Sequence, residues 1–300
     1  MNEHEQSSGS SSLQYGVAFC CQMLAVSRQG YYKWLQNRDR PYKHALLLAQ
    51  MQAILDEDPE NANYGIVRMH QALKFKHKIT QSQSTVARVM RENGLIHKKK
   101  RNPLRLTKAD KAAQTSDDLL KRDFDAQEPN KKWVSDITQL PTADGKLYIS
   151  GIFDCFNNET VGLCMDNNMR AQLCVRTLNQ AMGLHRAKGV IFHSDRGSQY
   201  TSEEFRKSIK AFGVLQSMNS AGGRCHDNAK CESMWARFKE ELIYGKIDTA
   251  KMPMQAVKAL VWRYFFGYWN NRRICSAIGG VPPAHKRKCF YAAQRLLPAA

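Results

Sequence analysis

The chain has 300 residues, enough for two or three domains with a sizeable core, and 43% of them are hydrophobic, which excludes a disordered protein. Lysine and arginine number 45 against 27 acidic residues, so the formal net charge is +18. A surplus of this size favours a polyanionic partner, nucleic acid before a membrane surface.

The cellular compartment is indicated by what the sequence lacks. Residues 1–12 are polar and do not form a signal peptide, and the longest apolar stretch, residues 17–26, is too short to span a bilayer. The nine cysteines are scattered and include no CxxC pair, which indicates reduced thiols. We therefore expect a cytoplasmic protein with no membrane partner.

The N-terminal part predicts helices. Residues 1–12 are rich in serine and glycine and predict a disordered tail, and residues 13–95 predict a helix-turn-helix region. Within it, residues 15–38 predict two short helices joined by a turn at Val26 to Gly30. Exposed Arg28 and Lys33 would then contact DNA, although a small helical bundle without DNA contacts explains the same pattern.

A second helical block follows and leads into a basic segment. Apolar spacing predicts helices over residues 46–55, 64–73 and 84–90, the last ending at Asn93-Gly94. Residues 96–130 predict a basic interdomain linker. A run of this kind is often only solvated, but next to a helical module we expect it to follow a phosphate backbone, through Lys98, Lys99, Lys100 and Arg101.

From Lys131 the pattern changes to strands. Gly145 and the Asn157-Asn158 pair separate three of them as hairpins, and helices then alternate with strands. This order predicts an α/β core over residues 131–245, with the mixed sheet of the RNase H-like fold, and a C-terminal helical extension over residues 246–300. The predicted strands are 133–140, 147–156, 160–165, 189–193 and 214–217, and the predicted helices are 171–184, 202–212, 228–242 and 256–269.

Three carboxylates occupy notable positions in this core. Asp136 lies inside an apolar strand, where an unpaired charge is costly. Asp195 directly follows a buried strand, at the end where α/β sheets place their ligand sites. Glu232 lies on a helix and shares a face with Asn228 and Lys239 through steps of four and seven residues. A single acid at a strand end usually caps a turn, so only the combination predicts a site.

The chemistry of such a trio is that of hard cations. Carboxylate oxygens without His or Cys favour Mg²⁺ or Mn²⁺, and two ions of this kind can activate an attacking hydroxyl and stabilise the leaving oxygen at phosphorus. We expect Lys239 and Asn228 to contact DNA, and Gly197 to allow its close approach. Cys225, His226 and Cys231 lack a fourth ligand at zinc spacing, which disfavours zinc.

The same segments carry a resemblance to a known family. Trp133-Val-Ser-Asp-Ile-Thr, His193-Ser-Asp-Arg-Gly-Ser-Gln-Tyr and Glu232-Ser resemble the catalytic protein of insertion-sequence transposases of the DDE type, the OrfB product of two-frame elements in the retroviral integrase superfamily. Later matches are Tyr268-Trp-Asn-Asn-Arg-Arg and Pro282-Pro283, and the N-terminal region is similar to that family's helix-turn-helix region through Tyr31-Tyr-Lys-Trp.

The resemblance implies a function and partners. Asp136, Asp195 and Glu232 would be the catalytic, metal-binding acids, and the N-terminal modules would bind the terminal repeats of the element. The reaction would be 3′-end cleavage followed by strand transfer into target DNA, at the bacterial nucleoid. The implied partners are double-stranded DNA, further copies of the chain assembled on DNA, and an upstream-frame (OrfA) protein or fusion.

One departure from the family pattern keeps alternatives open. The family usually has 35 residues between its second and third acids, whereas 36 separate Asp195 from Glu232. We expect the extra residue in the loop 219–224, where Gly222-Gly223 would accommodate it. The alternatives are a catalytically silent DNA-binding regulator or transposition inhibitor that retains the fold, and an RNase H-like nuclease acting on hybrids, which the helix-turn-helix region disfavours.

Overall fold

The computed structural model describes residues 16–96, 116–219 and 228–296. The chain divides into two compact units, Met1–Ala49 and Gln50–Ala300. This division falls inside the segment for which we predicted one helix-turn-helix region, and the predicted domain boundaries stay predictions. No helix in the described residues is long and apolar enough to cross a membrane.

The first unit contains the two short helices predicted there, α1 (Val17–Met23) and α2 (Arg28–Asn37). The side chain of Ser27 caps α2 by accepting the N–H of Gly30 at 2.9 Å. The prediction that Gly30 ends a turn was therefore wrong: a serine cap starts the helix at Arg28, and Gly30 lies in its first turn. Cys21 is the only buried residue of these two helices.

Three longer helices follow, α3 (Ala45–Glu57), α4 (Ile66–His77) and α5 (Gln83–Glu92). Each predicted helix is present: α3 and α5 extend beyond their predicted bounds at both ends, whereas α4 starts two residues later and ends four residues later than predicted. A turn of 3-10 helix, Pro59–Asn63, which we did not predict, joins α3 to α4. Asn93 caps the end of α5, and Gly94 takes the left-handed conformation there (φ 66°), as the sequence predicted.

The five predicted strands form one mixed sheet in the order β3-β2-β1-β4-β5. β1, β2 and β3 pair antiparallel as hairpins, and β4 and β5 run parallel to β1. This is the RNase H-like arrangement, so the predicted fold class is confirmed. The strands are β1 (Lys132–Thr142), β2 (Gly145–Asp154), β3 (Thr160–Asp166), β4 (Ile191–Ser194) and β5 (Leu215–Met218).

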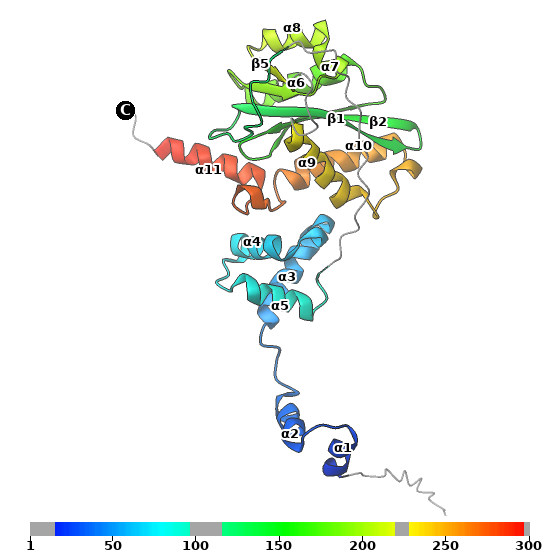
Figure 1. Ribbon diagram of the computed structural model, residues 1–300, viewed down its shortest axis with the longest axis vertical. Coiled ribbons are helices and arrows are strands. Elements are labelled where there is room, and N and C mark those ends of the chain that lie inside the picture. The colour runs from blue at the N-terminus through cyan, green and yellow to red at the C-terminus, as the bar shows by residue number, and fades with distance from the viewer. Residues whose placement is uncertain (1–15, 97–115, 220–227, 297–300) are drawn as a thin grey trace, which may run out of the picture. The chain divides into compact units, whose positions relative to one another are not determined.

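Helices cover both faces of the sheet, with α6 and α8 on one side and α9 and α10 on the other (Figure 1). α9 ends in a π-helical turn, Lys239–Ile243, and α10 continues as the π-helical Arg263–Trp269. α7 and α11 lie outside the helices that we predicted. The bounds are α6 (Ala171–His185), α7 (Ser198–Thr201), α8 (Glu203–Ala211), α9 (Ala229–Phe238), α10 (Met254–Trp262) and α11 (Pro283–Leu296).

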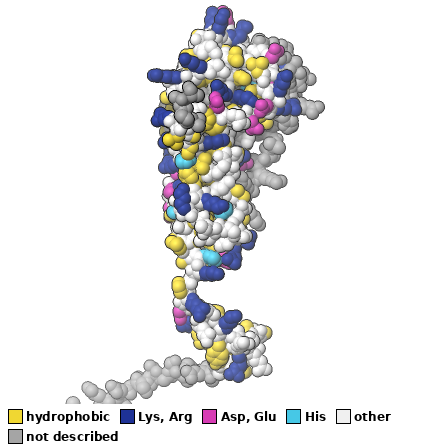
Figure 2. Space-filling view, turned by 90° about the vertical axis from the view of Figure 1, so that its left-hand side faces the viewer, with side chains coloured by type: hydrophobic (Ala, Val, Ile, Leu, Met, Phe, Trp, Pro, Cys, Tyr) yellow, Lys and Arg dark blue, Asp and Glu magenta, His cyan; other side chains and the backbone are white. Residues whose placement is uncertain are grey.

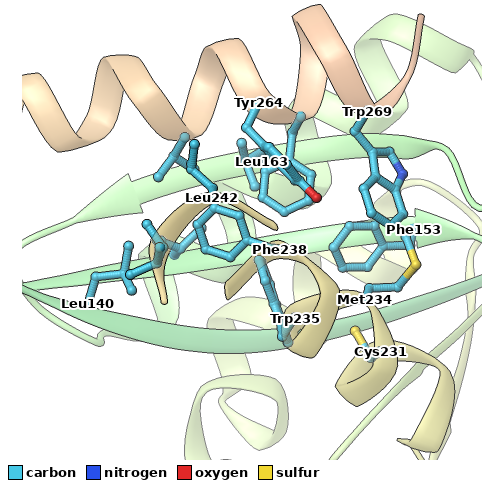
Figure 3. Close-up of a cluster of buried hydrophobic side chains, with 14 of the residues drawn as sticks. Leu140, Phe153, Leu163, Cys231, Met234, Trp235, Phe238, Leu242, Tyr264 and Trp269 are labelled. Carbon is cyan, nitrogen blue, oxygen red and sulfur yellow. The ribbon is translucent and has the colours of Figure 1, made fainter. Parts of the chain in front are cut away.

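The sheet separates two hydrophobic cores. Trp133 packs with α6 and α8, whereas its neighbour Val134 faces α9 and the C-terminal helices, because successive strand side chains point to opposite faces. The second core is rich in aromatic rings, and Figure 3 shows Phe153, Trp235 and Phe238 grouped under the helix that carries Tyr264 and Trp269. Since Asp136 is two residues beyond Val134, its side chain belongs to this same α9 face.

A buried ion-pair cluster joins α4 to the helices that follow the sheet in the chain. Glu241, in the π-turn after α9, accepts hydrogen bonds from Arg273 at 2.7 Å to each carboxylate oxygen, from Arg68 at 2.9 Å and from Tyr264 at 3.0 Å. Nearby, Glu60 pairs with Arg263. These contacts hold α4 against the core within the second compact unit.

Candidate active site

Strand register places Asp136 beside Asp195. In the parallel pairing of β1 with β4, Val134 lies opposite His193. Asp136 follows Val134 by two residues on β1, and Asp195 follows His193 by two residues, directly after the end of β4. Neighbouring strands are about 4.8 Å apart, so the two acids lie near the same edge of the sheet. The carboxyl ends of parallel strands are where α/β sheets carry ligand sites. The fold thus brings together two carboxylates that are 59 residues apart in the sequence, between positions 136 and 195.

The loop after β4 fixes the Asp195 carboxylate. The N–H of Gly197 donates to Asp195 Oδ1 at 2.9 Å. A methyl group on Gly197 would lie 3.1 Å from the same oxygen and 2.8 Å from Oε1 of Gln199, so the absence of a side chain keeps this turn tight. The structure therefore gives Gly197 a role in orienting Asp195. The predicted DNA contact of Gly197 stays a prediction.

Other residues of the His193-Ser-Asp-Arg-Gly-Ser-Gln-Tyr segment fasten this loop to its neighbours. Buried His193 lies 2.9 Å from the hydroxyl of Ser217 on β5. The hydroxyl of Tyr200 lies 2.9 Å from that of Ser135, which precedes Asp136. These supporting contacts were not predicted, because their partners lie on other strands and no local pattern indicates them.

The third acid, Glu232, is carried by α9, which packs closely on the sheet beside Asp136. Gly151 on β2 lies opposite Asp136, and a methyl group there would lie 2.8 Å from the ring of Trp235 on α9. The helix can approach the strand only because this position has no side chain. Sequence reasoning missed Gly151, although an isolated glycine inside a strand often marks such a close approach.

The charges of Asp195, Glu232 and Lys239 all act on the Asp136 carboxylate. Burial, then the negative charges of Asp195 and Glu232, raise the pKa of Asp136 from 3.8 to about 8, while the N–H of Ile137 and the charge of Lys239 oppose the rise. Burial also raises the pKa of Asp195. Burial lowers the pKa of the Lys239 ammonium, and Asp136 counteracts this. We call Asp136, Asp195 and Glu232 the acidic trio.

The trio does not form a closed ligand cage. Asp136 and Asp195 are half-buried and Glu232 is exposed. Within the described ranges, no three His, Cys, Asp or Glu side chains converge as a metal-binding group. Mutual repulsion among like charges favours such separation. The chemistry of the set nevertheless fits a divalent cation: its donors are carboxylate oxygens, and a positive charge between them would relieve the repulsion that raises the pKa of Asp136.

The predicted DNA-contact residues differ in their exposure in the structure. Arg28 and Lys33 are exposed on α2, as a DNA contact requires. Asn228 is only 4% exposed, and its side-chain amide donates to the carbonyl oxygen of Ser135 at 3.1 Å. The structure thus contradicts the prediction of a surface contact there, because the side chain turns inward to tie the start of α9 to β1. Lys98, Lys99, Lys100 and Arg101 lie outside the described residues, as does most of the loop 219–224.

Comparison with known proteins agrees with this geometry. Profiles of two families, each described as an integrase core domain, match residues 126–223 and 214–283. The transposase for insertion sequence element IS629 of Shigella sonnei is 31% identical over 286 residues, which cover 93% of this chain and 94% of that protein. The transposase InsF for insertion sequence IS3A of Escherichia coli (strain K12) is 31% identical over 273 residues, covering 90% and 93%.

The chain belongs to the insertion-sequence transposases with an integrase core. It is therefore a polynucleotidyl transferase of the DDE superfamily, and the predicted family is confirmed. Among solved structures, the intasome of simian T-cell lymphotropic virus gives a TM-score of 0.46 at 15% identity, covering 77% of this chain and 73% of that chain. The HTLV-2 integrase catalytic core in complex with magnesium gives 0.37 at 14% identity, covering 54% and 97%. The sequence matches to the two transposases establish the family, and these structural likenesses add nothing to it.

Proposed function

We propose that this transposase binds the terminal repeats of its element and catalyses 3′-end cleavage and strand transfer of DNA at the acidic trio. The observation that supports the proposal is the β1–β4 register: Asp136 and Asp195 each follow a paired residue by two positions, and the charges of Asp195 and Glu232 both raise the pKa of Asp136. The relatives IS629 and IS3A transposases support a DNA substrate, and the net charge of +18 suits a polyanion.

The trio would hold divalent metal, Mg²⁺ or Mn²⁺, in a pair of ions. Bound metal would activate the attacking hydroxyl and stabilise charge on the leaving oxygen in an in-line displacement at phosphorus. The chain's own contribution is positioning. The N–H of Gly197 orients the Asp195 carboxylate, and the Lys239 ammonium, beside Asp136, would attract the scissile phosphate.

DNA binding would extend beyond the acidic trio. Lys and Arg side chains are spread widely over the face of the molecule in Figure 2, where acidic side chains are fewer. We propose that the α1–α2 helices, through Arg28 and Lys33, and the segment with Lys98, Lys99, Lys100 and Arg101 contact the terminal repeats. Strand transfer at two ends requires at least two copies, so we expect the protein to form oligomers on DNA, with or without an upstream-frame OrfA partner, in the bacterial cytoplasm.

The deciding experiment is a nicking and strand-transfer assay on linear DNA that carries the element's own ends, with Mg²⁺ and with EDTA. We compare the wild type with Glu232→Gln and with Glu204→Gln, an exposed helical glutamate on α8 as matched control. We expect metal-dependent 3′-end cleavage in the wild type and the control but not in Glu232→Gln. A second readout is the melting temperature, which Mg²⁺ should raise in the wild type more than in Glu232→Gln.

The alternative of a silent DNA-binding regulator predicts a different result. Such a protein would bind the ends tightly but would not cleave them, with any divalent metal and with the upstream partner added. That outcome would overturn the enzymatic proposal. Cleavage by the wild type would also show that 36 residues between Asp195 and Glu232 are compatible with activity.

A further inference from the structure

A hollow of about 640 Å³ lies beside the helix that carries Glu232. Its walls include Ser233 and Arg237 of α9, Arg68 of α4, and Lys286 of α11. Ser233 directly follows Glu232, so the hollow adjoins the helix of the acidic trio. It is distinct from the trio itself, because none of the three acids lines it.

The hollow is strongly cationic. Five basic side chains line it, and Asp125 is the one acidic side chain among its described lining residues. Glu241 does not line the hollow, but it pairs with two of these basic residues, Arg68 and Arg273. The hollow keeps a positive charge even so. Its basic residues are Arg68, Lys230, Arg237, Arg273 and Lys286.

Two of the lysines are held close to each other by neighbouring backbone carbonyls. Lys230 Nζ donates to the carbonyl oxygen of Cys155 at 2.7 Å, and Lys286 Nζ donates to that of Phe156 at 2.9 Å. Burial lowers the pKa of Lys286 and the charge of Lys230 lowers it further, while the charges of Asp154 and Asp125 oppose part of this lowering. In the part of the chain that the structure describes, neither lysine forms an ion pair with a carboxylate. Two like charges held together in this way are stabilised by an anion that binds both.

Arg237 adds a group suited to phosphate. Its side chain is exposed at the hollow, and its hydrogen bond in the structure is a long one, 3.4 Å to the Ser233 hydroxyl. A planar guanidinium presents a fork of donors that matches two phosphate oxygens. One exposed arginine and two half-buried lysines together offer the donors that a phosphodiester group requires.

We propose that this hollow binds the phosphodiester backbone of duplex DNA next to the acidic trio, through Arg237, Lys230 and Lys286. The inference rests on the proposed function in one respect, that DNA is the substrate. It adds a binding site that would hold the DNA on the flank of α9 while the trio acts on the scissile phosphate.

The test is the salt dependence of DNA binding by the full-length protein, measured by fluorescence anisotropy on duplexes with and without the element's ends. Each backbone contact contributes about 0.9 to the slope of log K against log salt concentration. We expect Arg237→Gln and Lys286→Gln each to lower the slope by about that amount and to weaken binding severalfold on both duplexes. Arg206→Gln, an exposed arginine on α8, serves as the matched control and should leave the slope unchanged.

Several outcomes decide the proposal. Unchanged slopes in both hollow variants would overturn it, and so would binding of inorganic phosphate that is lost in the variants without any change in the DNA slope. Glutamine was chosen at position 286 because it removes the charge but still has an N–H donor, as the Phe156 carbonyl oxygen requires. Arg237→Lys keeps the charge and should therefore retain most of the slope. Strand transfer is assayed separately. Reduced slopes together with a wild type that does not cleave DNA would overturn the proposed function and support DNA binding at the hollow.

Discussion

Two carboxylates near α9 are affected by burial in the same direction, but their final states differ. Burial alone would raise the pKa of Glu241, but Arg273 and Arg68 lower it to about 2. Burial and two neighbouring acids raise the pKa of Asp136 to about 8. The first acid has its counter-charges within the fold, and the second has like charges around it. The charge of Glu241 is thus compensated within the fold, whereas that of Asp136 would be stabilised by a bound cation, as the proposed function requires.

The largest effect is expected from neutralising Asp136, the carboxylate with like charges around it. We expect Asp136→Asn to reduce cleavage and strand transfer by about 10³-fold or more, because an amide would replace the oxygen that we propose to bind metal. The same substitution should increase the stability of the folded protein at high pH, although it removes activity. A raised pKa means that the folded protein keeps a proton that the unfolded chain loses, so wild-type stability falls as pH rises from about 4 to about 8. The variant should lack this fall and be more stable than the wild type at pH 8, by on the order of a few kcal/mol, measured by urea unfolding.

Asp154→Asn is the matched control for that result. Asp154 is a fully buried strand carboxylate whose pKa is raised by burial to about 6, but its two oxygens accept the N–H groups of Asn130 at 2.7 Å and of Phe156 at 2.9 Å. An amide would turn a donor toward one of these N–H groups, so we expect a loss of about 1–3 kcal/mol and normal cleavage by the folded fraction. Equal loss of activity in both variants would contradict the assignment of Asp136.

The next largest effect concerns Glu241. Glu241→Gln removes the counter-charge of buried Arg273, and breaking one side of such a pair costs about 3–5 kcal/mol. Because the pKa of Glu241 is lowered, its contribution is fully present above about pH 4.5 and is lost as the pH falls toward 2. We therefore expect the stability difference between wild type and variant to shrink over that range in acid unfolding. Glu204→Gln should stay within about 0.5 kcal/mol.

The same two acids show what the sequence could predict. Asp136 was found because apolar residues flank it in a strand pattern and because Asp195 and Glu232 lie in recognisable sequence motifs. In these cases the residues adjacent in the sequence carried the information. The sheet itself was predicted for the same reason. Glu241 gave no such signal, since its partner Arg68 lies 173 residues away and only the folded chain brings the two together. Asn228 was misassigned because helical spacing gives the face of a residue but not the direction its side chain takes at a helix start.

A smaller effect is expected from the spacing between α9 and the sheet. Gly151→Ala adds a methyl group that meets the Trp235 ring at 2.8 Å and Phe153 at 3.1 Å. We expect a loss of about 1–3 kcal/mol from overpacking and a fall in cleavage of about tenfold, since the shift of α9 displaces Glu232. Gly183→Ala on α6 is the control: a methyl group there meets nothing within 4 Å and should add about 0.5–1 kcal/mol of stability. Full activity in Gly151→Ala would show that Glu232 tolerates the displacement.

The finest test acts on the orientation of Asp195. In Gly197→Ala, the added methyl group lies 3.1 Å from Asp195 Oδ1 and 2.8 Å from the flexible end of Gln199, which can move aside. Backbone φ is negative there (−55°), so no backbone strain is added, and because both crowded side chains can move, stability should change by less than about 0.5 kcal/mol. We expect cleavage to fall only about three- to tenfold, with unchanged affinity for DNA, because the carboxylate turns slightly from its position beside Asp136. Gly65→Ala, at an open position before α4, should leave both quantities unchanged. If Gly197→Ala weakened DNA binding and spared the cleavage step, the glycine would serve the approach of DNA and not the orientation of Asp195.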